Sequence, residues 1–185
     1  MTNTIDLDLD VDLSPGDVAE RLIMLPWLGI RMESVDTEER EYPLYQMGNA
    51  DIDVVSTFRP YDGPGAPITL SDEAVGVHVP RRVELSFTSR KSGEGFNHNN
   101  RTSYRVLSWL IRHVPGNYFM AHEGGAPYAC HVDGQTWVFD RAGAWNDERG
   151  WPEDWGLSVP YRFRRADAPP PDPLPPLRNA GAAAS

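Results

Sequence analysis

Residues 5–13 read IDLDLDVDL, and this strict alternation is the pattern that decides the fold. Successive side chains of a β-strand point to opposite faces of a sheet, so the stretch predicts a half-buried strand with one apolar and one acidic face. The apolar side chains are those of Ile5, Leu7, Leu9, Val11 and Leu13, and the acidic ones are those of Asp6, Asp8, Asp10 and Asp12. Like charges on one strand face repel each other, so the acidic face is a candidate surface for a basic partner.

The predicted strand runs directly into a helix signal. Ser14 can cap a helix, Pro15 suits its first position, and Asp17 lies where the helix dipole favours an acid. Apolar residues then follow at roughly helical spacing until Pro26. The sequence therefore predicts a strand followed by a short helix.

A second helix and further strands are expected along the rest of the chain. Residues 100–114 carry apolar side chains at three- and four-residue steps, which predicts an amphipathic helix. Strands are expected over 29–35, around Leu44, and over 51–59, 83–88, 118–122, 128–132 and 136–140. The dipeptide Asp133-Gly134 is a two-residue hairpin signal between the last two of these strands.

These elements predict an α+β fold with a single domain over residues 1–165. Its sheet is expected to be mostly antiparallel, with two covering helices and a C-terminal three-stranded meander. Residues 60–67 hold three prolines and two glycines and predict a loop. Residues 166–185 are rich in proline and alanine and predict a disordered tail.

The net charge of −10 is concentrated in the first half of the chain. Residues 1–80 hold 16 acids and 4 bases, whereas residues 81–185 hold 11 acids and 13 bases. An acidic surface repels nucleic acids and anionic membranes and attracts basic proteins, so a basic protein partner is expected and direct nucleic-acid or membrane binding is not. The alternative is that the charge only keeps the protein soluble. Neither a signal peptide nor a membrane span is recognisable, so a cytoplasmic protein is expected.

A tryptophan-rich segment near residues 145–155 forms a second candidate surface. Three tryptophans lie there beside acidic residues, the composition expected of a binding hot spot for an arginine-rich partner. The alternative is that these tryptophans belong to the core and its rim. With the strand aspartates and the acidic run around residue 38, the predicted partner-binding residues are Asp6, Asp8, Asp10, Asp12, Glu38, Glu39, Trp145, Trp151, Glu153, Asp154 and Trp155.

No motif in the sequence predicts catalysis, a cofactor or a metal. A calcium loop that began at Asp6 would need glycine at its sixth position and glutamate at its twelfth, where Val11 and Asp17 stand. Zinc-ligand spacings are absent as well. The thiol of the single cysteine, Cys130, and the imidazole of His122 could meet across a hairpin as nucleophile and base, which keeps a small hydrolase as an alternative.

The order of several segments resembles the immunity proteins of the myxobacterial Sit lipoprotein-toxin exchange system. The matching segments are Leu-Ser-Pro at 13–15, VELSFTSRK at 83–91, the helix YRVLSWLIRHVPG at 104–116, and the strands NYFMAHEG at 117–124 and TWVFDR at 136–141. The resemblance covers residues 1–25 and 80–145. It implies a small acidic α+β protein that protects a cell from a cognate toxin, and it implies no catalytic residues.

The sequence therefore favours an acidic, non-enzymatic protein that neutralises a basic toxin by stoichiometric binding. Two alternatives stay open: a nucleic-acid mimic from a phage or mobile element that inhibits a DNA-binding defence protein, and the small hydrolase with Cys130 and His122. The first alternative depends on the regular spacing of the strand aspartates, which is close to the spacing of phosphates along one DNA strand.

Overall fold

The computed structural model describes residues 4–37, 42–58, 83–90, 95–122, 126–140, 150–165 and 172–178, without the side chains of residues 95–99 and 126. Its elements in chain order are β1 (Thr4–Val11), α1 (Pro15–Ile23), β2 (Arg31–Asp36), β3 (Leu44–Gly48), β4 (Ile52–Phe58), β5 (Val83–Ser89), α3 (Gly95–His113), β6 (Gly116–His122), β7 (Ala126–Val132), β8 (Gln135–Asp140) and β9 (Arg162–Arg165). The strands form one nine-stranded sheet in the order β2-β3-β4-β5-β1-β6-β7-β8-β9. Among the described strands, β8 and β9 pair in parallel and the other neighbouring strands pair antiparallel. The predicted α+β class with a mostly antiparallel sheet is confirmed.

Strand β1 lies in the middle of the sheet, between β5 and β6. Leu7 stands opposite Leu85 on one side and opposite Met120 on the other. All three side chains are fully buried, as the alternation of residues 5–13 predicts. The first strand of the chain therefore organises both halves of the sheet.

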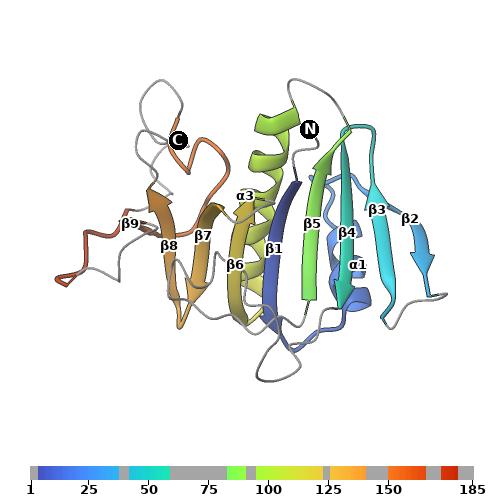
Figure 1. The fold of residues 1–185 in the computed structure, drawn as a ribbon, viewed down its shortest axis with the longest axis horizontal. Helices are drawn as coiled ribbons and strands as arrows, with labels where there is room; N and C mark the ends of the chain where they lie inside the picture. The colour runs from blue at the N-terminus through green and yellow to red at the C-terminus, as the bar shows by residue number, and fades with distance from the viewer. Residues whose placement is uncertain are drawn as a thin grey trace.

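Both described helices lie on the same face of the sheet (Figure 1). Helix α1 packs against β2, β3 and β4, and helix α3 packs against β5, β1 and β6. The main hydrophobic core lies between this helical layer and the sheet, and the odd-numbered apolar residues of β1 point into it.

The start of α1 has the predicted cap. The Ser14 hydroxyl accepts a hydrogen bond from the Asp17 backbone N–H at 3.1 Å, and the Asp17 carboxylate accepts one from the Ser14 backbone N–H at 3.0 Å. This reciprocal pair satisfies two backbone donors that a helix start otherwise leaves without partners. The strand-to-helix boundary is therefore encoded locally.

The opposite face of the sheet, which no helix of the described residues covers and which we call the helix-free face, has a polar centre and an apolar side. On β6, β7 and β8 a second cluster gathers Phe119, Ala121, Cys130, Trp137 and Phe139. On β1 and β5 the residues of this face are instead acids and hydroxyls, because the alternation of β1 turns its aspartates away from the helices. The acidic strand face predicted from the sequence is therefore the centre of the helix-free face.

The C-terminal strands follow one another as hairpins. Strands β6, β7 and β8 pair antiparallel in succession. Asp133 and Gly134 have φ angles of 51° and 76°, the left-handed pair that a type I′ turn needs. The hairpin predicted from this dipeptide is confirmed.

Three regions differ from what the sequence predicts: the start of α3, strand β9 and residues 172–178. Helix α3 begins at Gly95 instead of residue 100, and β9 was not anticipated. In the segment predicted to be a tail, residues 172–178 are described, and Arg178 pairs with Tyr161 through two backbone hydrogen bonds of 2.8 and 3.0 Å. The loop predicted over 60–67 lies outside the described residues. Within the part of the chain described, no helix is long and apolar enough to cross a membrane.

Replacing Leu107 by alanine tests the packing of α3. Leu107 is fully buried in the main core, so Leu107→Ala should lower the free energy of unfolding by about 2–5 kcal/mol in a denaturant titration. Arg101→Ala, on the exposed side of the same helix, should change it by less than about 0.5 kcal/mol. Equal stabilities of the Leu107 variant and the control would show that α3 does not pack as described.

Candidate functional site

The aspartates of β1 differ greatly in accessibility. Asp8 is only 6% exposed and stands directly opposite Glu84 of β5, which is 7% exposed. Asp6 is half-buried and accepts a hydrogen bond of 2.7 Å from the Ser86 hydroxyl. Asp10 is half-buried, and Asp12, beyond the end of the strand, is exposed. The four aspartates therefore do not form one exposed acidic row.

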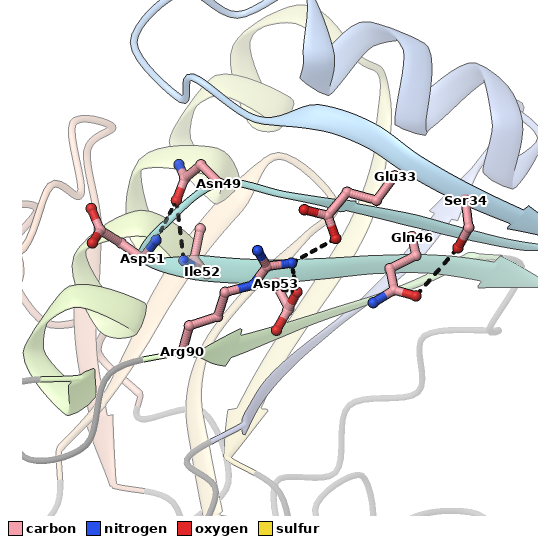
Figure 2. Close-up of polar contacts among 8 residues, drawn as sticks. All are labelled: Glu33, Ser34, Gln46, Asn49, Asp51, Ile52, Asp53 and Arg90. Atoms are coloured by element: carbon pink, nitrogen blue, oxygen red, sulfur yellow. Dashed lines mark hydrogen bonds and ion pairs between the residues drawn. The ribbon is translucent and has the colours of Figure 1, made fainter.

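Toward the β2 edge of the sheet, on the helix-free face that carries the β1 aspartates, an arginine pairs with two further acids. Figure 2 shows Arg90, just after β5, between Asp53 of β4 and Glu33 of β2. The guanidinium donates to the Asp53 carboxylate from Nε at 2.8 Å and to the Glu33 carboxylate at 2.6 Å. These two hydrogen bonds raise the pKa of Arg90. The single positive charge of Arg90 thus offsets part of the negative charge of Glu33 and Asp53 within the chain.

Gly48 of β3 allows the Arg90 guanidinium to cross this strand. A Cβ at Gly48 would lie 2.8 Å from the guanidinium and 2.9 Å from the Ile52 carbonyl oxygen. The neighbouring turn is held by Asn49, whose side-chain oxygen accepts hydrogen bonds from the backbone N–H groups of Asp51 and Ile52 (Figure 2). This cluster fixes the β3–β4 hairpin and has the features of a structural ion-pair network.

Residues 151–158, which include the described part of the tryptophan-rich segment, fold as a compact turn that docks on α3. The backbone N–H of Leu157 donates to the Pro152 carbonyl at 3.0 Å, and Gly156 adopts φ +100°. A Cβ at Gly156 would lie 2.4 Å from Cγ of Arg105, so only glycine permits this approach to the helix. The backbone N–H of Ser158 then donates to the Ser108 hydroxyl of α3 at 2.9 Å. The turn is therefore positioned by α3 on one side and leads into β9 on the other.

An arginine side chain lies against the aromatic and acidic residues of this segment. The guanidinium of Arg178 is 4.4 Å from the ring centroid of Trp151 and 5.2 Å from that of Phe163. Its Nη2 lies 3.9 Å from the Glu153 carboxylate, which also accepts a hydrogen bond from the Tyr161 hydroxyl. We call Trp151, Glu153, Tyr161 and Phe163 the arginine cage. Its chemistry, aromatic faces beside a carboxylate, is suited to a guanidinium.

The other predicted residues of this patch serve the turn itself or lie outside the described residues. The Asp154 carboxylate accepts a hydrogen bond of 2.7 Å from the Trp151 backbone N–H. Trp155 is half-buried and packs against the main core. Glu38, Glu39 and Trp145 lie outside the described residues. Of the predicted patch, Trp151 and Glu153 thus contact the Arg178 guanidinium.

Sequence reasoning missed three members of this site. Tyr161 and Phe163 alternate with arginines in YRFRR, which is a period-2 signal for a strand with one aromatic face. Arg178 is the only basic residue of the segment 166–185. Arg178 is thus the only basic side chain that this proline- and alanine-rich segment can offer to the aromatic and acidic patch before it in the sequence. This is the signal that could have indicated the contact of Arg178 with the arginine cage.

Cys130 and His122 are not brought together. Cys130 stands opposite Phe119 in the second apolar cluster, and the ring of His122 contacts that of Tyr128 instead. Burial raises the pKa of the Cys130 thiol to about 12, so the reactive thiolate is disfavoured. The described residues contain no group of three or more His, Cys, Asp or Glu side chains that could hold a metal ion.

Comparisons with protein-family models, with curated proteins and with solved structures found no match to this chain. The resemblance to Sit immunity proteins therefore stays a prediction from the sequence.

Alkylation tests the environment of Cys130. Because the thiol is fully buried and its pKa is raised to about 12, iodoacetamide at pH 8 should label it only after denaturant unfolds the protein, as measured by intact mass. Rapid labelling of the folded protein would contradict the described burial.

The half-buried His131 should make the protein less stable in weak acid. Burial lowers its pKa below the usual 6.5, and Nδ1 lies 2.8 Å from the Thr136 hydroxyl. As the pH falls, the His131 imidazole is protonated more readily in the unfolded chain than in the folded protein. The free energy of unfolding therefore falls as the pH drops below about 6.5. His131→Asn should lose less unfolding free energy than the unmodified protein between pH 7.5 and 5.5. Equal losses in the two proteins would exclude this role of His131.

Proposed function

We propose that this protein neutralises a cognate basic toxin by forming a stoichiometric complex, and that the arginine cage is a central contact in that complex. The observation that carries the proposal is the guanidinium of Arg178 in the cage, between an indole ring and a carboxylate. The sequence predicts that the aromatic and acidic patch binds an arginine-rich partner, and in the structure Trp151 and Glu153 of this patch contact an arginine of the same chain.

The chemistry of the cage favours arginine over other side chains. A guanidinium over an aromatic face gains about 0.5–2 kcal/mol, depending on how far the contact is desolvated. Arginine also stacks on flat rings and is more weakly hydrated than lysine, so it tolerates this partly buried setting better. Aromatic anchors of this kind dominate the energetics of many protein interfaces.

A partner's arginine can compete with Arg178 for the cage. The Arg178 side chain is 38% exposed, and its Nη2 lies 3.9 Å from the Glu153 carboxylate. Exposed ion pairs of this kind contribute little. The segment is also held by the two backbone hydrogen bonds with Tyr161, by the ring contacts of Arg178, and by a hydrogen bond from the Arg162 guanidinium to the Pro175 carbonyl oxygen, and a partner's arginine has to displace these contacts. The segment 172–178 is therefore an intramolecular competitor that lowers the apparent affinity for a partner.

The acidic N-terminal half would assist such a complex from a distance. The described residues of 12–37 and 42–58 hold seven acids and two arginines, a balance of −5. A surface of one sign speeds the encounter with a partner of the other sign. A toxin that acts on nucleic acid is commonly basic because its substrate is an anion, and this is the class of partner that the charge favours.

The nucleic-acid mimic has no comparable support. A mimic needs a regular row of exposed carboxylates, and burial of Asp8 removes the middle of the row on β1.

The test is co-expression with each protein encoded next to this one, followed by measurement of the dissociation constant of any complex that forms. Trp151→Ala should weaken the complex by about tenfold or more, because it removes the main wall of the cage. Arg178→Ala should instead strengthen it by several-fold, because the competitor is gone. The affinity should fall as the salt concentration rises.

Two control variants show whether loss of any exposed tryptophan or arginine changes the affinity. Trp27→Ala is matched to Trp151→Ala, and Arg21→Ala is matched to Arg178→Ala. Trp27→Ala removes a partly exposed tryptophan outside the cage, and Arg21→Ala removes an exposed arginine of α1. Both should leave the dissociation constant unchanged. Absence of binding to any neighbouring toxin-like protein would refute the function, and a complex that neither cage variant alters would refute the role of the cage.

A further inference from the structure

A second site lies on the other side of the same turn, between α3 and the segment that follows Trp155. It is a hollow of about 280 Å³. Its lining residues are Trp27, Arg105, Trp109, Arg112, Gly156 and Ser158. We call this hollow the α3 pocket. None of its residues belongs to the arginine cage or to the predicted partner-binding set.

The pocket is cationic although the protein is strongly acidic. Within the described part of the chain, neither Arg105 nor Arg112 lies within 4.0 Å of a carboxylate oxygen. Arg105 places its guanidinium 4.3 Å from the ring centroid of Trp27, and Arg112 donates a hydrogen bond to the Ser158 carbonyl oxygen. In a chain with a net charge of −10, two arginines at one hollow without a described carboxylate partner form a local positive site.

Both arginines are exposed, and each has a contact that restrains its guanidinium: the Trp27 ring for Arg105 and the Ser158 carbonyl oxygen for Arg112. Arg105 is held between the Trp27 ring and the backbone at Gly156, where a Cβ would lie 2.4 Å from its Cγ. Trp109 is half-buried against the core and stacks on His113, with ring centroids 5.0 Å apart. Contacts of this kind pre-organise donors and flat walls before a ligand arrives, which lowers the entropic cost of binding.

We propose that the α3 pocket binds a small organic anion that carries a flat ring. Two guanidinium groups offer several N–H donors to a carboxylate or phosphate. Arg105 and His113 each occupy one face of Trp27 and Trp109, respectively, so a flat ring would stack on the other face of one of these indoles. The volume lies at the lower end of the range of small-molecule sites, which fits one ring with one anionic group. The proposal does not rest on the toxin-binding function, since the cage takes a cation and the pocket takes an anion.

Calorimetric titration with two pairs of probes tests the proposal and distinguishes its ligand chemistries. Benzoate and adenosine 5′-monophosphate supply a flat ring with a carboxylate or a phosphate, and benzamide and adenosine are their uncharged counterparts. At least one anionic probe should bind the full-length protein in the millimolar range or tighter, and its neutral counterpart should bind at least tenfold more weakly. Binding of benzoate alone would assign a carboxylate ligand, and binding of adenosine 5′-monophosphate alone would assign a phosphate ligand.

Variants on the same helix locate the site. Arg105→Gln and Arg112→Gln should each weaken binding of the anionic probe by about tenfold, the loss expected for one charge-assisted hydrogen bond. Arg101→Gln, exposed on α3 but outside the pocket, should leave binding unchanged. A thermal melt of each variant shows whether the fold is retained, and a salt titration of the unmodified protein gives a second readout, since added salt should weaken binding.

Three results would overturn the proposal. These are no binding of either anionic probe by the unmodified protein, equal binding of an anionic probe and its neutral counterpart, and equal weakening by Arg101→Gln and the two pocket variants.

Discussion

The alternation of apolar and acidic residues along β1 is the constraint on which the rest of the structure depends. This strand lies in the middle of the sheet and pairs with both β5 and β6. A slip of one residue would turn its aspartates toward the helices and its leucines away from them, so the pairing register is strongly fixed. Because the leucines must face α1 and α3, the acids must lie on the helix-free face, where Asp8 comes to stand opposite Glu84.

The C-terminal part of the chain builds its sites on the scaffold that β1 organises. Helix α3 packs over β5, β1 and β6, and the turn that begins at Trp151 docks on its outer side through Gly156 and Ser158. One short segment thus contributes to both proposed sites: a cage of aromatic rings and a carboxylate, and a pocket with two guanidinium groups. An acidic net charge alone would not have indicated that the protein also carries a positive pocket.

The features predicted from the sequence are those encoded over a few neighbouring residues. The alternation of β1, the Ser14 cap and the Asp133-Gly134 turn each depend on local geometry, and the structure confirms all three. Features that depend on distant pairing were missed. Strand β9 pairs in parallel with β8 after a long connection, and the cage needs Arg178 to meet Trp151. The burial of Asp8 likewise depends on β5 and β6 lying on either side of β1. The sequence of β1 alone does not determine which strands become its neighbours.

Amide hydrogen exchange tests most directly whether a partner's arginine replaces Arg178 in the cage. In the free protein the Arg178 backbone N–H donates to the Tyr161 carbonyl oxygen at 2.8 Å, so exchange there should be slowed. In the complex with the toxin-like protein encoded nearby, residues 172–178 should exchange faster and residues 151–163 more slowly than in the free protein. Unchanged exchange in both segments of a formed complex would contradict the central role of the cage.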